Sequence, residues 1–324
     1  MIQEIWRSNN ILSNVLKPLS LVYYLVYLFY RSLRSEKIFK TPVLCVGNAT
    51  VGGSGKTPVV IKLRQLLDQD FTKIFVLTRG YTGREKGPLV VNNRSSFLDV
   101  GDESVLHSKY GPTCMAKDKV DGAMLCEMNN SKLIIMDDGL QSIDIKKDLR
   151  ILVIDGDYGF GNENILPAGP LREPINKAIK SSDFILIVGN KEIRKKYKQI
   201  PSNKVFYAKK KIKIYNLKGK KLYVFSALGN NQNFYNSLYE GGLQIIEFKE
   251  FPDHHFFKDN EIRNIVLEAK EKNLTIVCTF KDYLKLPEKY KKNIFPVDLD
   301  IKIKDSHRFA KKILNSIKSK RIQN

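Results

Sequence analysis

The chain has 324 residues, of which 43% are hydrophobic, and it carries a formal net charge of +21. This length exceeds the size at which a single core keeps growing, so we expect two domains with well-packed cores. The four cysteines show neither C-x-x-C spacing nor a Cys/His ligand pattern, which excludes a disulfide scaffold and a zinc finger and indicates reduced core thiols of a cytosolic protein.

The positive charge favours three kinds of acidic partner, namely nucleic acid, an anionic membrane surface and a phosphorylated substrate. Much of the charge comes from lysines spread along the whole chain. A bias in genome composition explains such a distribution equally well, so the charge alone selects no partner.

Residues 18–30 form an uncharged run that contains four tyrosines. The run is shorter than the about 20 apolar residues that a bilayer span needs, and it lacks the small-residue cleavage site of a signal peptide. Leu21, Leu25 and Leu28 fall on one helical face, and basic residues flank the run on both sides. We therefore expect a helix that lies in the membrane interface, with an ordinary buried helix as the alternative.

Residues 43–58 place an apolar run, a glycine-dense loop and the triplet Gly55-Lys56-Thr57 in direct succession. This order is typical of a phosphate-binding loop between a buried parallel strand and a helix. In that motif the lysine reaches the β- and γ-phosphates of a nucleotide and the threonine hydroxyl binds Mg²⁺. The strict motif has glycine where this chain has Thr50, so the loop is a variant.

Further apolar segments alternate with helical patterns, which predicts a parallel α/β sheet of the P-loop NTPase type. These segments are residues 73–77, 133–136, 149–155 and 184–188. Asp137 and Asp138 follow the second of them directly. Two carboxylates at a strand end are typical of the second half of a nucleotide site, where an aspartate binds Mg²⁺ directly or through water.

Composition changes after Gly189, where basic and polar residues precede short alternating segments at 205–207 and 212–215. These segments predict a short antiparallel ribbon between two lobes, and the segments beyond it predict a second, smaller α/β lobe. We therefore expect a P-loop kinase domain over residues 1–204 and a smaller α/β domain over residues 205–324. The ribbon's lysines indicate edge strands protected from aggregation rather than a nucleic-acid surface.

Two adjacent histidines, His254 and His255, follow Phe-Pro-Asp in the second lobe. The pair is consistent with a surface loop, with one ligand of a metal site, or with a catalytic histidine. Adjacent side chains cannot easily face one point and no third ligand stands at zinc spacing, so a catalytic role is the sharper hypothesis.

Six motifs occur in order along the chain. They are Val-Gly-Asn-Ala-Thr-Val-Gly-Gly-Ser-Gly-Lys-Thr-Pro (46–58), Thr-Arg-Gly-Tyr (78–81), Val-Gly-Asp-Glu (100–103), Asp-Asp-Gly-Leu-Gln (137–141), Leu-Pro-Ala-Gly-Pro-Leu-Arg-Glu-Pro (166–174) and Phe-Pro-Asp-His-His (251–255). Together they resemble the tetraacyldisaccharide 4'-kinases of lipid A biosynthesis. The resemblance covers nearly the whole chain and includes the variant loop and the apolar N-terminal helix.

The resemblance implies an ATP- and Mg²⁺-dependent enzyme on the cytoplasmic face of a Gram-negative inner membrane, bound as a peripheral or monotopic protein. It implies transfer of the γ-phosphate to the 4'-hydroxyl of a tetraacylated glucosamine disaccharide 1-phosphate. The expected partners are this lipid and the anionic membrane surface, without nucleic acid, and the expected state is a monomer.

The resemblance also implies roles for individual residues. Asp102 and His254 match the pair to which the family's base function is assigned, and Lys56 and Asp138 complete the expected catalytic set. The expected metal site consists of Thr57, Asp137 and Asp138. The residues expected to bind ATP are Thr50, Val51, Gly52, Gly53, Ser54, Gly55, Lys56, Thr57, Arg172 and Glu173.

Two positions depart from the family pattern. The chain has Leu140-Gln141-Ser142 where the family commonly has Phe-Gln-His, so no role is assigned to Ser142, and it has Thr82 in place of a glycine.

Two rival classes of P-loop protein stay open. A GTPase-like switch needs Asn-Lys-x-Asp, which the nearest match at residues 190–193 lacks, and a nucleic-acid-dependent ATPase is supported by the ribbon lysines alone.

Overall fold

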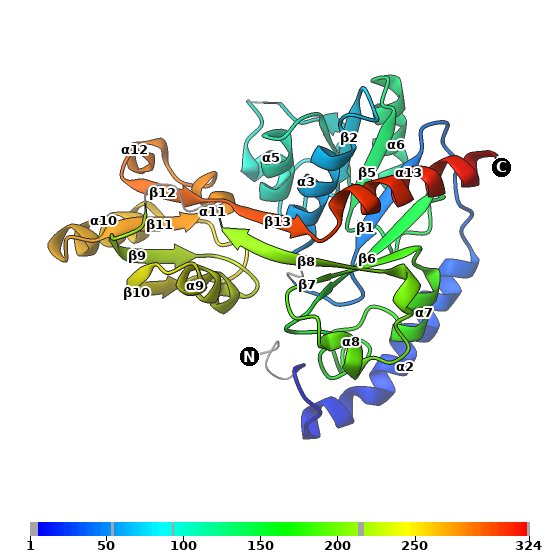
Figure 1. The fold of residues 1–324 in the computed structure, drawn as a ribbon, viewed down its shortest axis with the longest axis horizontal. Helices are drawn as coiled ribbons and strands as arrows, with labels where there is room; N and C mark the ends of the chain where they lie inside the picture. The colour runs from blue at the N-terminus through cyan, green and yellow to red at the C-terminus, as the bar shows by residue number, and fades with distance from the viewer. Residues whose placement is uncertain (1–5, 53–54, 93, 213–216, 323–324) are drawn as a thin grey trace.

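The computed structural model describes residues 6–52, 55–92, 94–212 and 217–322. These residues form one sheet of nine strands and one of four (Figure 1). Gly53 and Ser54 of the predicted phosphate-binding loop and residues 213–216 of the predicted ribbon lie outside the described residues.

The large sheet has the strand order β13-β8-β7-β6-β1-β5-β2-β4-β3. Its strands are β1 (Val43–Gly47), β2 (Ile74–Thr78), β3 (Leu89–Val90), β4 (Thr113–Met115), β5 (Leu133–Asp137), β6 (Leu149–Asp155), β7 (Phe184–Val188), β8 (Val205–Ile212) and β13 (Leu299–Ile303). Strands from β8 to β4 pair in parallel, and β13 and β3 are antiparallel at the two edges. Every residue of β1 is buried, as expected for the centre of a sheet covered on both faces.

Side chains that alternate along β1 enter two different cores. Leu44 and Val46 pack with α3 (Lys56–Leu67) and α13 (Ser306–Ile322), whereas Cys45 packs with α6 (Lys119–Met128) on the opposite face. Helices α7 (Ile175–Ser181) and α8 (Ile193–Lys196) cover that opposite face further along the sheet. The predicted P-loop NTPase-like α/β architecture is confirmed, and all four cysteines are buried free thiols.

The small sheet has the order β10-β9-β11-β12, and all of its neighbouring strands are parallel. Its elements are β9 (Lys221–Ser226), α9 (Asn231–Glu240), β10 (Gln244–Glu250), α10 (Asp259–Glu271), β11 (Thr275–Thr279), α11 (Phe280–Tyr283), α12 (Glu288–Lys291) and β12 (Ile294–Val297). The second lobe is therefore α/β, as the sequence predicts.

An antiparallel ribbon of β8 and β13 joins the two sheets (Figure 1). The chain leaves the large sheet along β8 and returns along β13, so the two strands are neighbours although almost ninety residues separate them. Helix α13 then packs on the large sheet. The division at residue 204 stays a prediction. Because β8, β13 and α13 belong with the large sheet, we propose that the smaller domain comprises only residues 221–297.

Helix α2 (Ile11–Ser32) lies at the periphery of the large domain beside α7 (Figure 1). Its Ser20 hydroxyl donates to the carbonyl of Ile165 at 2.7 Å, and the Lys177 ammonium lies 4.7 Å from the centre of the Tyr27 ring. Of the residues in α2, only two serines are buried. Leu25 is 55% exposed and Phe29 is 67% exposed. The alternative of an ordinary buried helix is therefore wrong.

The expectation that this segment is too short to span a bilayer is also wrong, because it counted only the uncharged run of residues 18–30. The helix has 22 residues, and its length and composition suffice for one membrane crossing. Length and composition alone do not distinguish a helix that spans a membrane from one that lies in its interface.

Candidate active site

The N-terminus of α3 meets the carboxyl ends of β1 and β5. Gly55 precedes the helix with a φ of 73°, a left-handed conformation that glycine adopts without strain. Lys56 and Thr57 then form the first helical turn, where unpaired backbone N–H groups favour an anion. The Lys56 ammonium donates to Asn48 Oδ1 at 3.0 Å and lies 3.7 Å from Asp138 Oδ2.

Asp137 and Asp138 close β5, which pairs directly with β1. The Thr57 hydroxyl donates to Asp137 Oδ2 at 3.2 Å, and Arg172 donates to both carboxylate oxygens of Asp138, at 2.9 and 3.0 Å. Burial alone would raise the pKa of Asp138, but the positive charges of Lys56 and Arg172 lower it to about 2. Asp138 is therefore ionised at neutral pH.

His107 of α5 (Asp102–Ser108) also belongs to this site and was not predicted from the sequence. Its Nε2 lies 2.8 Å from Asp137 Oδ2, and the ring is almost fully buried. Asp137 Oδ1 is buried without a hydrogen-bond partner among the described residues. His107 could have been found only from the fold, because helical spacing from Asp102 says nothing about a contact with β5.

The unpaired Asp137 oxygen and the Thr57 hydroxyl are hard oxygen donors of the kind that Mg²⁺ prefers. Within the described ranges, no cluster of three or more His, Cys, Asp and Glu side chains could hold a metal by itself. Mg²⁺ usually binds one or two carboxylates and completes its shell with water and substrate phosphates. The residues present therefore fit a magnesium ion that binds together with a nucleotide.

A second group of charged residues joins the two sheets. His254, in the loop after β10, places its Nδ1 at 2.9 Å from Asp102 Oδ2 and 3.1 Å from Asp102 Oδ1. Burial alone would raise the pKa of Asp102, but the hydrogen bond from His254 and the charge of Lys281 hold it well below its usual range. The structure thus brings together two residues that lie 152 positions apart in the chain.

The local backbone explains both positions. Gly101 has a φ of 81°, and a Cβ atom there would lie 2.4 Å from the carbonyl oxygen of Tyr81, so glycine is required before Asp102. His254 itself has a φ of 60°, which is unusual for a residue with a side chain and is frequent at functional sites. The Tyr81 ring meets the imidazole edge-on, with 5.1 Å between the ring centres.

His255 points elsewhere. Its Nε2 lies 2.9 Å from Glu261 Oε2 and its ring stacks on Phe251. The two histidines therefore do not share a target, which agrees with the expectation that adjacent side chains diverge. Of the pair, only His254 reaches Asp102 among the described residues.

Arg172 and Glu173 belong to a loop that runs along the phosphate-binding loop. The Val51 amide donates to the carbonyl of Pro170 at 2.8 Å, and the Arg172 amide donates to that of Ala49 at 2.8 Å. Glu173 is buried and accepts a hydrogen bond of 2.9 Å from Gln141 Nε2. Because Gln141 Nε2 also donates to the carbonyl of Asn48, Glu173 stabilises the start of the phosphate-binding loop through Gln141.

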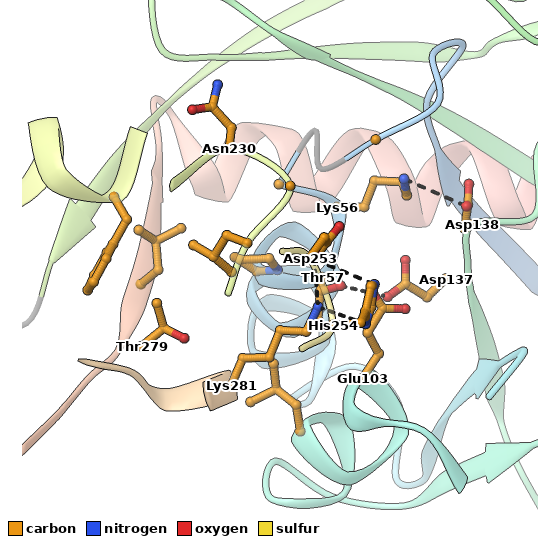
Figure 2. A pocket seen from close by; sticks show the side chains of 18 of the residues that line it. Lys56, Thr57, Glu103, Asp137, Asp138, Asn230, Asp253, His254, Thr279 and Lys281 are labelled. Carbon is orange, nitrogen blue, oxygen red and sulfur yellow. Dashed lines mark hydrogen bonds and ion pairs between the residues drawn. The ribbon is translucent and has the colours of Figure 1, made fainter. Parts of the chain in front are cut away.

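One cavity of about 750 Å³ is lined by charged residues of both lobes (Figure 2). Of the predicted site residues, those that line it are Val51, Gly52, Gly55, Lys56, Thr57, Asp137, Asp138, Arg172 and His254. Thr50, Asp102 and Glu173 are buried and are not among the lining residues, and Asp102 contacts the lining side chains of His254 and Lys281. The lining also includes side chains to which the sequence alone assigned no role: Glu103, Lys210, Asn230, Asn233, Thr279, Lys281 and Asp298.

The cavity can hold an anion with a metal at one end and activate a hydroxyl at the other. Comparison with known proteins agrees with this chemistry. A sequence model of the family described as tetraacyldisaccharide-1-P 4'-kinase matches residues 12–318. The chain belongs to the tetraacyldisaccharide 4'-kinase family. It is therefore a kinase.

Individual relatives support the same assignment. The tetraacyldisaccharide 4'-kinase of Paramagnetospirillum magneticum is 36% identical over 88% of this chain and 89% of its own length. That of Rickettsia canadensis is 34% identical over 96% and 95%. A crystal structure of LpxK from Aquifex aeolicus, described as an "apo" form in complex with ATP, is similar with a TM-score of 0.78 and 28% identity, over 95% of this chain and 100% of that chain.

Membership of the 4'-kinase family does not favour the two rival classes, a GTPase-like switch and a nucleic-acid-dependent ATPase.

One departure from the family pattern is the segment Leu140-Gln141-Ser142. Gln141 is kept and links the carbonyl of Asn48 to Glu173, whereas the Ser142 hydroxyl is buried without a hydrogen-bond partner in the part of the chain that the structure describes. Nothing in the structure gives Ser142 a role.

Proposed function

We propose that this chain transfers the γ-phosphate of ATP to the 4'-hydroxyl of a tetraacylated glucosamine disaccharide 1-phosphate, a step of lipid A biosynthesis. The observation that carries the proposal is the single cavity whose lining contains both Lys56 and Asp138 and the imidazole of His254, which is bonded to the buried Asp102. The names of the family relatives and the ATP in the Aquifex aeolicus structure support both substrates.

The large sheet binds the nucleotide phosphates. The amides at the start of α3 and the Lys56 ammonium, which is 12% exposed and lies beside the cavity, neutralise the β- and γ-phosphates. Thr57, Asp137 and Asp138 would hold Mg²⁺, which neutralises developing charge on the phosphate oxygens when bound. Arg172 and Lys56 fix the direction of the Asp138 carboxylate.

The small sheet supplies the residue that activates the acceptor. A sugar hydroxyl is a poor nucleophile at neutral pH, and a histidine whose other nitrogen is bonded to a carboxylate is suited to accept its proton. His254 Nδ1 donates to Asp102, and Nε2, which lies 3.7 Å from Asp253 Oδ1, is the nitrogen that can take the proton. Asp102 fixes this tautomer and stabilises the imidazolium that forms. Phosphoryl transfer needs little more than this alignment and charge neutralisation.

Helix α2 offers a membrane-binding surface for a lipid kinase. Its serine side packs on the protein, and the opposite side exposes Leu21, Leu25 and Phe29. We propose that this side enters the cytoplasmic face of the inner membrane as a peripheral or monotopic element, with the basic charge of the chain drawn to anionic lipids. We also propose a monomer that needs no nucleic acid, since residues of one chain supply both halves of the cavity.

The proposal is tested by incubating the purified chain with ATP, Mg²⁺ and the tetraacyldisaccharide 1-phosphate and locating the new phosphate by ³¹P–¹H NMR. We expect a phosphomonoester coupled to the 4'-proton, and no product when Mg²⁺ is chelated. A phosphate at another hydroxyl, or ATP hydrolysis without lipid product, would contradict the proposal.

A further inference from the structure

Lys281 is the first charged residue of α11, at the carboxyl end of β11 in the small sheet. Its ammonium lies 3.3 Å from Asp102 Oδ2, which belongs to the large domain, and 3.9 Å from Asp253 Oδ1. The same nitrogen is 3.4 Å from His254 Nδ1 (Figure 2). Its side chain is 15% exposed, so this charge is largely removed from water.

A buried hydrogen-bond network anchors the helical turn that carries this side chain. The Thr279 hydroxyl accepts from the Asp282 amide at 3.0 Å and donates to the Asp282 carboxylate at 2.7 Å. That carboxylate also accepts from the Ala227 amide at 3.0 Å and pairs with Lys285 at 2.8 Å. These contacts anchor the single turn of α11, and Lys281 extends from this anchored turn.

Lys281 and His254 both contact the Asp102 carboxylate. The chemistry of the three groups determines which of their atoms carry hydrogen. An ammonium can only donate hydrogen bonds, and an ionised Asp102 can only accept them, so it accepts from both groups. Burial alone would lower the pKa of Lys281, but the negative charges of Asp102 and Glu103 raise it, so the lysine is charged. An ionised Asp102 at 2.9 Å requires that His254 Nδ1 carry the hydrogen.

We propose that Lys281 is a positioning residue of the catalytic base, which holds the Asp102 carboxylate from the opposite sheet and opposes protonation of the His254 imidazole before the substrate proton arrives. The inference rests on the proposed function, because it assumes that His254 is the base. It also follows that the base is complete only when the two sheets meet, since Lys281 and His254 come from the small sheet and Asp102 from the large domain.

The charges around His254 determine the direction in which the pH profile should shift when Lys281 is replaced. Asp102 on α5 and Asp253 in its own loop favour the protonated imidazole, whereas Lys281 from α11 opposes it. The Tyr81 ring packs against the imidazole without a charge. Removing the ammonium therefore leaves two carboxylates unopposed, and His254 should then stay protonated to higher pH.

The test is the pH profile of kcat/KM for phosphate transfer to the lipid. In Lys281→Met we expect the acid limb to move to higher pH by roughly one unit, with the KM for ATP changed less than about twofold. Lys281→Gln should show the same shift, and Lys281→Arg should restore the wild-type limb. Lys289→Met is the matched control, because this exposed lysine of the small sheet pairs with Asp259 instead.

The outcomes distinguish a failure of the proposed function from a failure of the role proposed for Lys281. If wild-type enzyme makes no 4'-phosphate, the proposed function fails, and with it the assumption on which this inference rests. If wild type is active but both neutral variants, folded by circular dichroism, keep the wild-type acid limb, Lys281 is only structural and the inference is overturned. A shift of equal size in Lys289→Met would overturn it as well. If neither neutral variant folds, an unshifted limb in Lys281→Arg supports the proposal, and a moved limb contradicts it.

Discussion

Deletion of the Asp102–His254 pair, one residue at a time and together, tests whether the two side chains act as one base. His254→Ala removes the group that accepts the proton. Asp102→Ala leaves the imidazole in place, but the Lys281 ammonium, 3.4 Å from Nδ1, then has no carboxylate between it and the developing imidazolium. Either change should therefore disable the same step.

The expected magnitude follows from what general base catalysis contributes. Loss of a positioned base lowers kcat on the order of 10²–10⁴-fold, which corresponds to about 3–5 kcal/mol of activation free energy. Independent effects would multiply in the double variant. Residues of one unit are non-additive, so we expect the double variant to lose about as much as each single variant. The affinity for ATP should change little, because the pair lies on the acceptor side of the cavity.

The assay is single-turnover transfer of labelled γ-phosphate to the lipid at saturating ATP. His255→Ala is the matched control, because this neighbour bonds to Glu261 and should retain nearly full activity. If the losses from Asp102→Ala and His254→Ala multiply in the double variant, the residues act independently and the reasoning is refuted. A larger loss in His255→Ala would mean that the wrong histidine carries the chemistry.

Three further perturbations test other parts of the account. Lys56→Ala should lower kcat/KM by at least about 100-fold while circular dichroism stays native, because it removes a cation from the transferred phosphate without opening a core cavity; near-normal turnover would contradict this. Leu25→Glu should weaken co-sedimentation with anionic vesicles, because it places a charge on the exposed apolar side of α2; unchanged binding of the folded variant would exclude α2 as the membrane contact. Asp138→Asn should lower the thermal midpoint at pH 7 by an amount that shrinks as pH falls from about 4 toward 2. The native pKa of Asp138 is held at about 2, below the ordinary carboxyl value of about 3.9, so its stabilising ionised form is lost in that range. A difference that stays constant with pH would show that the ionised carboxylate contributes no stability.

The central strands β1, β2, β5, β6 and β7 could be predicted because their signals are local, whereas the short strands β3 and β4 and the edge strand β13 were not predicted. Val43–Gly47 is apolar on both faces and is followed directly by the glycine loop and α3, and Asp137 closes a second such strand. The ribbon could be predicted only in part. The sequence predicts alternating segments at 205–207 and 212–215, whereas the structure has one strand, Val205–Ile212, whose partner is β13. No local pattern encodes a pairing across so much chain. The return of α13 to the large sheet was missed for the same reason.

The active site shows the same difference between local signals, which the sequence contains, and long-range contacts, which it does not reveal. Lys56, Thr57 and the two aspartates lie in motifs whose spacing carries their chemistry. His107 and Lys281 lie in helices with ordinary composition, and only the fold brings them to Asp137 and Asp102. Helix α2 is a different case. Counting uncharged residues underestimated its length, because Lys17 and Arg31 are part of the helix.

The most direct measurement is transfer of label from [γ-³²P]ATP to the tetraacyldisaccharide 1-phosphate by the purified chain, with the Lys56→Ala and His254→Ala variants assayed in parallel. The account predicts that wild type forms a labelled bisphosphorylated lipid and that both folded variants lose at least about 99% of this activity, since each removes one side of the shared cavity. Wild-type levels of labelled lipid from either variant would contradict the claim that this cavity is where the phosphate is transferred.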